Sequence, residues 1–77
     1  MQFYNMIENE QQEIVKTIGE KIREKRLQLN LSQESVSNEA AIPRNQVGRI
    51  ERGEINTSIT TLGKICKVLK IELRELF

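Results

Sequence analysis

The side chains with the clearest chemistry lie close together over residues 43–52, which read PRNQVGRIER. Arg44 and Arg49 carry planar, permanently charged groups that can fork onto guanine, and the Asn45 carboxamide can pair with adenine. On a helix these three side chains lie on one face, and Gln46 points sideways, where it can reach a base or a phosphate. The segment therefore has the donors and acceptors needed to read the edges of base pairs.

This polar segment is the second of two short helical patterns separated by a tight break. Ser32 can accept from the free amides of the next turn, so it predicts a helix over residues 33–40. Pro43 fits the first position of a second helix, predicted over residues 43–52, because its missing amide hydrogen costs nothing there. Gly53 ends that helix in the left-handed conformation. Two helices about a turn are typical of a helix-turn-helix.

One acidic side chain falls on the inward face of the helix predicted over 43–52. Glu51 shares that face with Val47 and Ile50. A buried, unpaired carboxylate costs several kcal/mol, so Glu51 needs a partner. Arg26, half inward on the preceding helix, is the obvious candidate. The pattern predicts an ion pair that ties the two helices together; the alternative is two unrelated surface charges.

A glycine interrupts the outer face of the same helix. Gly48 costs roughly 1 kcal/mol of helix propensity at an interior position. It indicates either a close approach of a DNA strand to the backbone or drift at an unpacked surface site, and the sequence leaves both open.

Apolar periodicity predicts a helix on each side of this unit. The first runs from about Glu10 to Asn30, and Ser58 caps the second, in which Cys66 is most simply a small core residue. A last short helix contains Leu73, Leu76 and Phe77. The apolar stripes are Ile14, Val15, Ile18, Ile22 and Leu29 in the first helix, and Ile59, Leu62, Ile65, Cys66 and Leu69 in the second.

Composition excludes several classes of protein. The 77 residues form one small domain, whose marginal core makes dimerisation plausible. Cys66 is the single cysteine and no histidine is present, which excludes a zinc site and a Cys/His or Ser/His nucleophile pair. Without Asp or a glycine-rich phosphate loop, we expect neither an enzyme nor a cofactor. No apolar run is long enough for a membrane span and no signal peptide is visible, so the chain is expected in the cytoplasm.

Charge is distributed unevenly along the chain. The formal net charge is +1, but residues 1–20 carry −3 and residues 21–53 carry +3. The positive excess therefore lies on the helix-turn-helix segment. Attraction to phosphate depends on the local field of one face rather than on total charge, although ordinary solvated charge would give the same count.

A set of residues from Ile18 to Phe77 carries a resemblance to a known family, in register and without a gap. They are Ile18, Gly19, Ile22 and Arg26; Leu31, Ser32 and Gln33; Ile50, Glu51, Arg52 and Gly53; and Leu62, Ile65, Leu69, Leu73, Leu76 and Phe77. The chain resembles the helix-turn-helix family of lambdoid phage repressors, Cro proteins and their bacterial relatives, often called the xenobiotic-response-element family. The resemblance implies an all-α, five-helix, lambda-repressor-like domain over residues 18–77 that binds operator DNA, commonly as a homodimer.

The resemblance also implies roles for individual residues. Gln33 matches the family's glutamine at the start of the second helix, which resembles an anchor for a DNA phosphate. Asn56 and Thr57 lie in the loop where relatives touch the DNA backbone, and Arg52 is a further phosphate candidate. The chain departs from the family at Pro43 and Glu72, which replace usual helix caps, and at Lys70, which replaces a usual glycine.

The two ends of the chain are candidates for contacts with protein. The end formed by Leu73, Leu76 and Phe77 is expected to be exposed and is the first candidate for a dimer surface, and the N-terminal arm is the second. Residues 1–17 are predicted to be that arm and the start of the first helix, because the opening residues show no clear period. The arm's large side chains, which can also simply pack on the domain or fray, are Phe3, Tyr4, Met6 and Ile7.

Two functions remain open at this point. The first is a sequence-specific transcriptional regulator, expected to be a repressor or autoregulator, that places the helix over 43–52 in the major groove of a palindromic operator. The second is a protein-interaction module, such as an antitoxin or an accessory subunit, that binds its partner through the N-terminal arm.

Overall fold

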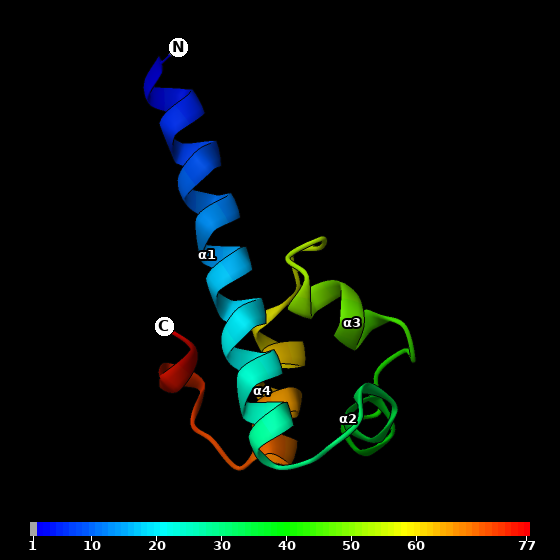
Figure 1. The fold of residues 1–77 in the computed structure, drawn as a ribbon. Helices are drawn as coiled ribbons and strands as arrows, with labels where there is room; N and C mark the ends of the chain where they lie inside the picture. The colour runs from blue at the N-terminus through cyan, green and yellow to red at the C-terminus, as the bar shows by residue number, and fades with distance from the viewer. Residues whose placement is uncertain (1) are drawn as a thin grey trace.

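The computed structural model describes the backbone of residues 2–77 and the side chains from Glu10 onward. The elements are α1 (Gln2–Gln28), α2 (Gln33–Ala40), α3 (Gln46–Glu51), α4 (Ile59–Leu69) and the 3-10 helix η1 (Leu73–Leu76). All regular structure in residues 2–77 is helical, which confirms the all-α class. Figure 1 shows α1 as one long rod, with the other helices gathered against its C-terminal half.

One hydrophobic core joins these helices. Helix α1 packs against α3, α4 and η1, and α2 packs against α3 and α4. The predicted position of Cys66 in the core is confirmed, since 3% of that residue is exposed. The buried apolar residues are Ile18, Ile22, Val36, Ala40, Val47, Ile50, Leu62, Ile65, Cys66, Leu69 and Leu76.

Helix α1 extends further toward the N-terminus than the sequence predicted. It begins at Gln2 rather than near Glu10, so residues 2–9 continue the helix instead of forming a separate arm. The prediction rested on apolar period, which is absent from the opening residues although their backbone is helical. The side chains of Phe3, Tyr4, Met6 and Ile7 lie outside the described residues.

Only part of the predicted apolar stripe of α1 is buried. Ile18 and Ile22 lie in the core, but Ile14 is 52% exposed and Leu29 is 37% exposed. Ile14 borders an open groove together with Leu76 and Phe77, and Leu29 lies in the turn after α1 ends. Sharing a stripe with core residues therefore did not bury these two side chains, because helical period gives direction but not the extent of the neighbouring surface.

Helices α1 and α3 approach most closely at a glycine. Gly19 is buried against the last turn of α3, where an added Cβ would collide with the Ile50 carbonyl oxygen and lie 2.8 Å from the Glu51 carbonyl oxygen. Backbone carbonyls at the end of a packed helix cannot move aside as a side chain can. The absence of a side chain at position 19 is therefore what lets the two helices meet.

The helix-turn-helix forms between Ser32 and Gly53. The Ser32 hydroxyl oxygen accepts from the Ser35 amide at 2.9 Å, and α2 covers residues 33–40 as predicted. Gly53 has φ +70°, which confirms the left-handed end of α3. The predicted start of α3 at Pro43 was wrong. The Gln46 amide bonds back three residues to the Pro43 carbonyl at 3.0 Å, so the preceding residues form a turn and α3 starts at Gln46.

The C-terminal elements follow the prediction in outline. Ser58 caps α4 by accepting from the Thr61 amide at 3.1 Å, but Ile59 is 60% exposed, because the first turn of α4 presents it to solvent. The predicted fifth helix is the four-residue 3-10 helix η1. Two residues here depart from the family pattern. Lys70 adopts φ +59°, a conformation in which glycine would be unstrained. The Glu72 amide, just before η1, donates to the Glu75 carboxylate at 2.7 Å.

We expect Gly19→Ala to destabilise the fold by about 2 to 3 kcal/mol, because the methyl group would force α1 away from α3. Urea unfolding followed by circular dichroism measures the change. Gly63→Ala is the matched control: nothing lies within 4 Å of an added Cβ there, so the substitution should stabilise α4 by about 0.5 to 1 kcal/mol. Equal effects at the two positions would contradict the close approach.

Candidate nucleic-acid interface

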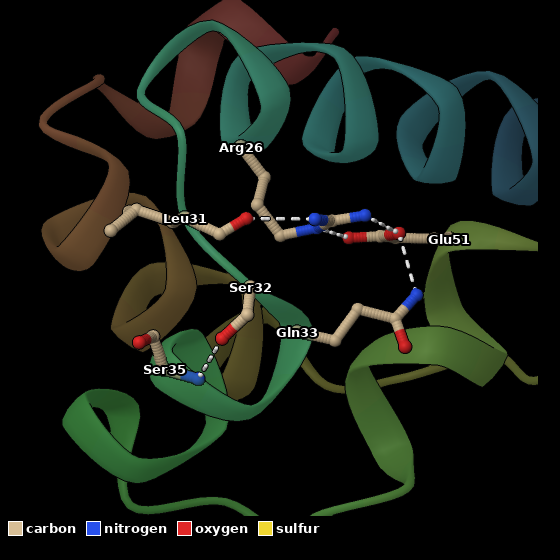
Figure 2. Close-up of polar contacts among 6 residues, drawn as sticks. All are labelled: Arg26, Leu31, Ser32, Gln33, Ser35 and Glu51. Atoms are coloured by element: carbon tan, nitrogen blue, oxygen red, sulfur yellow. Dashed lines mark hydrogen bonds and ion pairs between the residues drawn. The ribbon is translucent and has the colours of Figure 1, made fainter.

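The predicted ion pair between Arg26 and Glu51 is present and buried. Arg26 Nε donates to Glu51 Oε2 at 2.7 Å, and Arg26 Nη2 donates to Oε1 at 3.0 Å (Figure 2). The residues are 8% and 4% exposed. A third donor, Nη1, meets the Leu31 carbonyl at 2.8 Å. The hydrogen bond to Glu51 raises the pKa of Arg26 above its ordinary value, against the opposing effect of burial. The guanidinium therefore joins α1 to both the start of the helix-turn-helix and the end of α3.

The same carboxylate also orients Gln33, the predicted phosphate anchor. Gln33 Nε2 donates to Glu51 Oε1 at 3.1 Å, as Figure 2 shows. The first residue of α2 is thereby tied to the last residue of α3. Sequence reasoning identified Gln33 and Glu51 separately but missed this contact, because nothing in the spacing shows that the two helix ends face each other.

Gly48 lies between the two helices and not on the outer face of α3. It is buried, and an added Cβ would lie 3.0 Å from both Gln33 Oε1 and Arg52 Nη1. The prediction that placed Gly48 outward was wrong, because α2 crosses α3 on that side. The glycine at position 48 leaves room for the Gln33 side chain. This packing explains the glycine without drift at a surface site and without a close approach of DNA.

The remaining polar candidates form a surface, here called the α3 surface, from the turn before α3, α3 itself and the loop after it. Arg44 and Asn45 are exposed in the turn rather than on the helix, and Arg49 is exposed on α3. Gln46 is half-buried at the helix start. Arg52 and Asn56 are exposed beyond the helix end, and Thr57 is half-buried.

Carboxylates hold the three arginines of the α3 surface. Arg44 Nη2 lies 3.1 Å from Glu34 Oε2, Arg49 Nε lies 3.9 Å from Glu54 Oε1, and Arg52 Nε lies 2.5 Å from Glu54 Oε2. Sequence reasoning missed both glutamates. Glu54 could have been found from its position next to the helix end, whereas the Glu34 contact depends on how α2 and α3 pack.

The predicted dimer surface is partly interior. Leu76 is 1% exposed and belongs to the core, and Leu73 is half-buried, so treating these two as an exposed patch was wrong. The 3-10 turn directs Leu76 inward against the other helices. Phe77 is 63% exposed. It borders a shallow apolar groove between α1 and the C-terminus, lined by Glu13, Ile14, Thr17, Ile18, Leu76 and Phe77.

Other kinds of site are not seen in the part of the chain that the structure describes. It contains no group of three or more Cys, Asp or Glu side chains placed to hold a metal ion. No described helix is both long and apolar enough to cross a membrane. Burial raises the pKa of the Cys66 thiol, which suits a packing role rather than a nucleophile.

Comparison with known proteins agrees with this geometry. The helix-turn-helix family matches residues 22–76, so the chain belongs to that family. It is 37% identical over 59 residues to control protein C.BamHI of Bacillus amyloliquefaciens, covering 75% of this chain and 73% of that protein. The structure is similar to the restriction-modification controller protein C.AhdI from Aeromonas hydrophila, with 38% identity, a TM-score of 0.79 and coverage of 84% of this chain and 97% of that one.

A more distant structure shares the fold alone. The clp gene regulator ClgR from Corynebacterium glutamicum is 16% identical, with a TM-score of 0.78 over 82% of this chain and 67% of that chain. The fold, the family and the α3 surface together define a DNA-binding transcriptional regulator of the lambda-repressor-like, helix-turn-helix class.

We expect Glu51→Ala to destabilise the protein by about 3 to 5 kcal/mol, because Arg26 would remain buried without its partner. Urea unfolding measures the loss. Glu34→Ala, which breaks the exposed pair with Arg44, should cost at most about 1 kcal/mol. Replacing the whole pair, in Arg26→Met/Glu51→Leu, should recover most of the stability. A Glu51→Ala protein as stable as the parent would contradict the structural role of the pair.

Proposed function

We propose that this protein controls transcription by binding a palindromic operator as a homodimer, with α3 of each subunit in the major groove. The observation that carries the proposal is the α3 surface itself. It presents Arg44, Asn45 and Arg49 to solvent. On the opposite side of α3, Glu51 forms the buried ion pair with Arg26 of α1. A rigid helix with exposed arginine and carboxamide groups is the arrangement that reads the major groove.

Arg44, Asn45 and Arg49 are the proposed base-reading residues, with Gln46 at the edge of the set. Arg44, Asn45 and Gln46 lie just before and at the start of α3, which supports this role because the N-terminal residues of a recognition helix contact base edges; Arg49 follows within the same six-residue helix. An arginine can fork onto guanine O6 and N7, and asparagine or glutamine can pair with adenine N6 and N7.

The proposed phosphate contacts flank the base-reading residues. The Gln33 carboxamide has two N–H donors and gives one to Glu51, so the second can meet a phosphate oxygen at the start of α2. Arg52, Asn56 and Thr57 would contact the DNA backbone beyond the other end of α3. Positions on both sides of the helix would fix its register in the groove.

The similarity to C.BamHI and C.AhdI supports a more specific role. Both are named as control proteins, and C.AhdI as a controller of restriction-modification. We infer that this protein regulates restriction-modification genes, as a repressor or autoregulator. Its site of action would then be the cytoplasm, where bacterial DNA lies.

The homodimer would use the apolar groove beside Phe77. Ile14 and Phe77 are both large and exposed there, and Leu76 forms part of the lining. Two copies that cover each other's groove would remove these side chains from water. Pairing would also be required to set two copies of α3 about 34 Å apart on successive turns of DNA.

Base reading is tested with an operator selected from randomised DNA. Arg44→Ala or Arg49→Ala should each cost about 1 to 3 kcal/mol of binding free energy on that operator and relax the preference at one base position. Fluorescence anisotropy with matched and substituted operators measures both effects. Arg74→Ala is the control, since Arg74 is exposed on η1, away from the α3 surface. Equal losses on every DNA sequence would argue against base reading.

Dimerisation is tested by sedimentation equilibrium. Ile14→Glu should weaken self-association by about tenfold or more, because it places a charge in an apolar contact. Ile59→Glu is the matched control, because Ile59 is similarly exposed but lies on α4, outside the groove. A parent protein that stays monomeric at high concentration would contradict the proposed dimer.

A further inference from the structure

Two of the arginines on the α3 surface share one carboxylate. Glu54 accepts from Arg52 through both oxygens, at 2.5 Å from Nε and 3.3 Å from Nη2, and Arg49 Nε lies 3.9 Å away. All three side chains are about half exposed: Arg49 49%, Arg52 57% and Glu54 48%. The cluster therefore lies at the surface where DNA would approach and not in the core.

The position of Glu54 is set by the end of α3. Gly53 turns the chain with φ +70°, and the Glu54 amide then donates to the Arg49 carbonyl at 2.9 Å. This bond holds the backbone of residue 54 against the last turn of the helix. The carboxylate is thereby kept beside both arginines, and the hydrogen bond from Arg52 lowers the pKa of Glu54 below its ordinary, already acidic value.

An anion at this place competes with DNA. A phosphate oxygen that approaches Arg52 is repelled by the negative charge of Glu54 beside it, and Arg49 and Arg52 must leave or share that carboxylate before they bind DNA. On non-operator DNA both Arg49 and Arg52 can contact only phosphates, so both contacts compete with the pairing to Glu54. On a matching operator Arg49 would fork onto a base through two hydrogen bonds, a stronger contact than its 3.9 Å approach to Glu54, so the competition there falls mainly on Arg52.

We propose that Glu54 is a specificity-determining residue that suppresses binding to non-operator DNA by occupying Arg49 and Arg52. The inference rests on the proposed function of the α3 surface. It assigns to Glu54 an effect on the ratio between operator and non-operator affinity, and not a contact with a base.

The experiment compares Glu54→Gln with the parent protein. Affinity for a selected operator and for a random duplex of the same length is measured by fluorescence anisotropy over a range of KCl concentrations. Glu54→Gln should raise affinity for the random duplex by about threefold to tenfold and raise operator affinity less. The slope of log affinity against log salt on the random duplex should steepen by about 1 to 2, because freed arginines neutralise additional phosphates.

Glu72→Gln is the matched control. It makes the same change in net charge and breaks a comparable exposed pair, with Arg74 at 3.0 Å, but on η1. Glu54→Gln is expected to raise random-duplex affinity well above the Glu72→Gln level, with an unchanged urea midpoint. Equal effects of the two variants would overturn the proposal, because net charge alone would then explain them, and so would an equal rise on operator and random DNA.

Different results would contradict DNA-binding by this protein and the role of Glu54. If the parent protein binds no selected operator, the proposed function fails. If the parent binds its operator and Glu54→Gln leaves its discrimination against random DNA unchanged, the function stands and the role of Glu54 is wrong.

Discussion

The arrangement of the helix-turn-helix depends on one buried ion pair. The Arg26 guanidinium reaches from α1 to Glu51 at the end of α3 and to the Leu31 carbonyl just before α2. Desolvation offsets much of the attraction in such pairs, so its main effect is to define one geometry rather than to add stability. Gly19 lies two helical turns before Arg26, on the same face of α1, and brings the end of α3 close enough for that geometry.

The interior network also determines the chemistry of the surface. Glu51 accepts from Gln33 as well as from Arg26, and Gly48 leaves space for the Gln33 side chain. The start of α2 and the body of α3 are therefore positioned as one unit. On the outside, Glu34 and Glu54 pair with the arginines that would contact DNA. The α3 surface is consequently closer to charge balance than its arginines alone suggest.

Several features could be predicted because they depend on local chemistry or on one strong requirement. Ser32 predicts the start of α2 because its hydroxyl caps the helix, and Gly53 predicts the end of α3 because glycine adopts the left-handed conformation without strain. The inward position of Glu51 demanded a cation, and Arg26 was the available one. The wrong predictions concern which side chains are covered by other elements. Ile14 shares a helix face with core residues but lies at the edge of the core, on the open groove beside Phe77, and Leu76 of the 3-10 helix is buried.

The sequence by itself determined the all-helical class, the two helices about a turn, the polar groups able to read DNA and the need for the Arg26–Glu51 pair. The helices and the turn follow from periodicity and capping, which act over a few residues. The ion pair follows from the cost of burying a charge without a partner of opposite charge. The tertiary structure decided that Gly48 faces Gln33, that Leu76 is interior, and that Glu54 holds Arg49 and Arg52. These facts depend on which surfaces cover one another and where side chains meet, and helical period specifies direction without specifying what lies there.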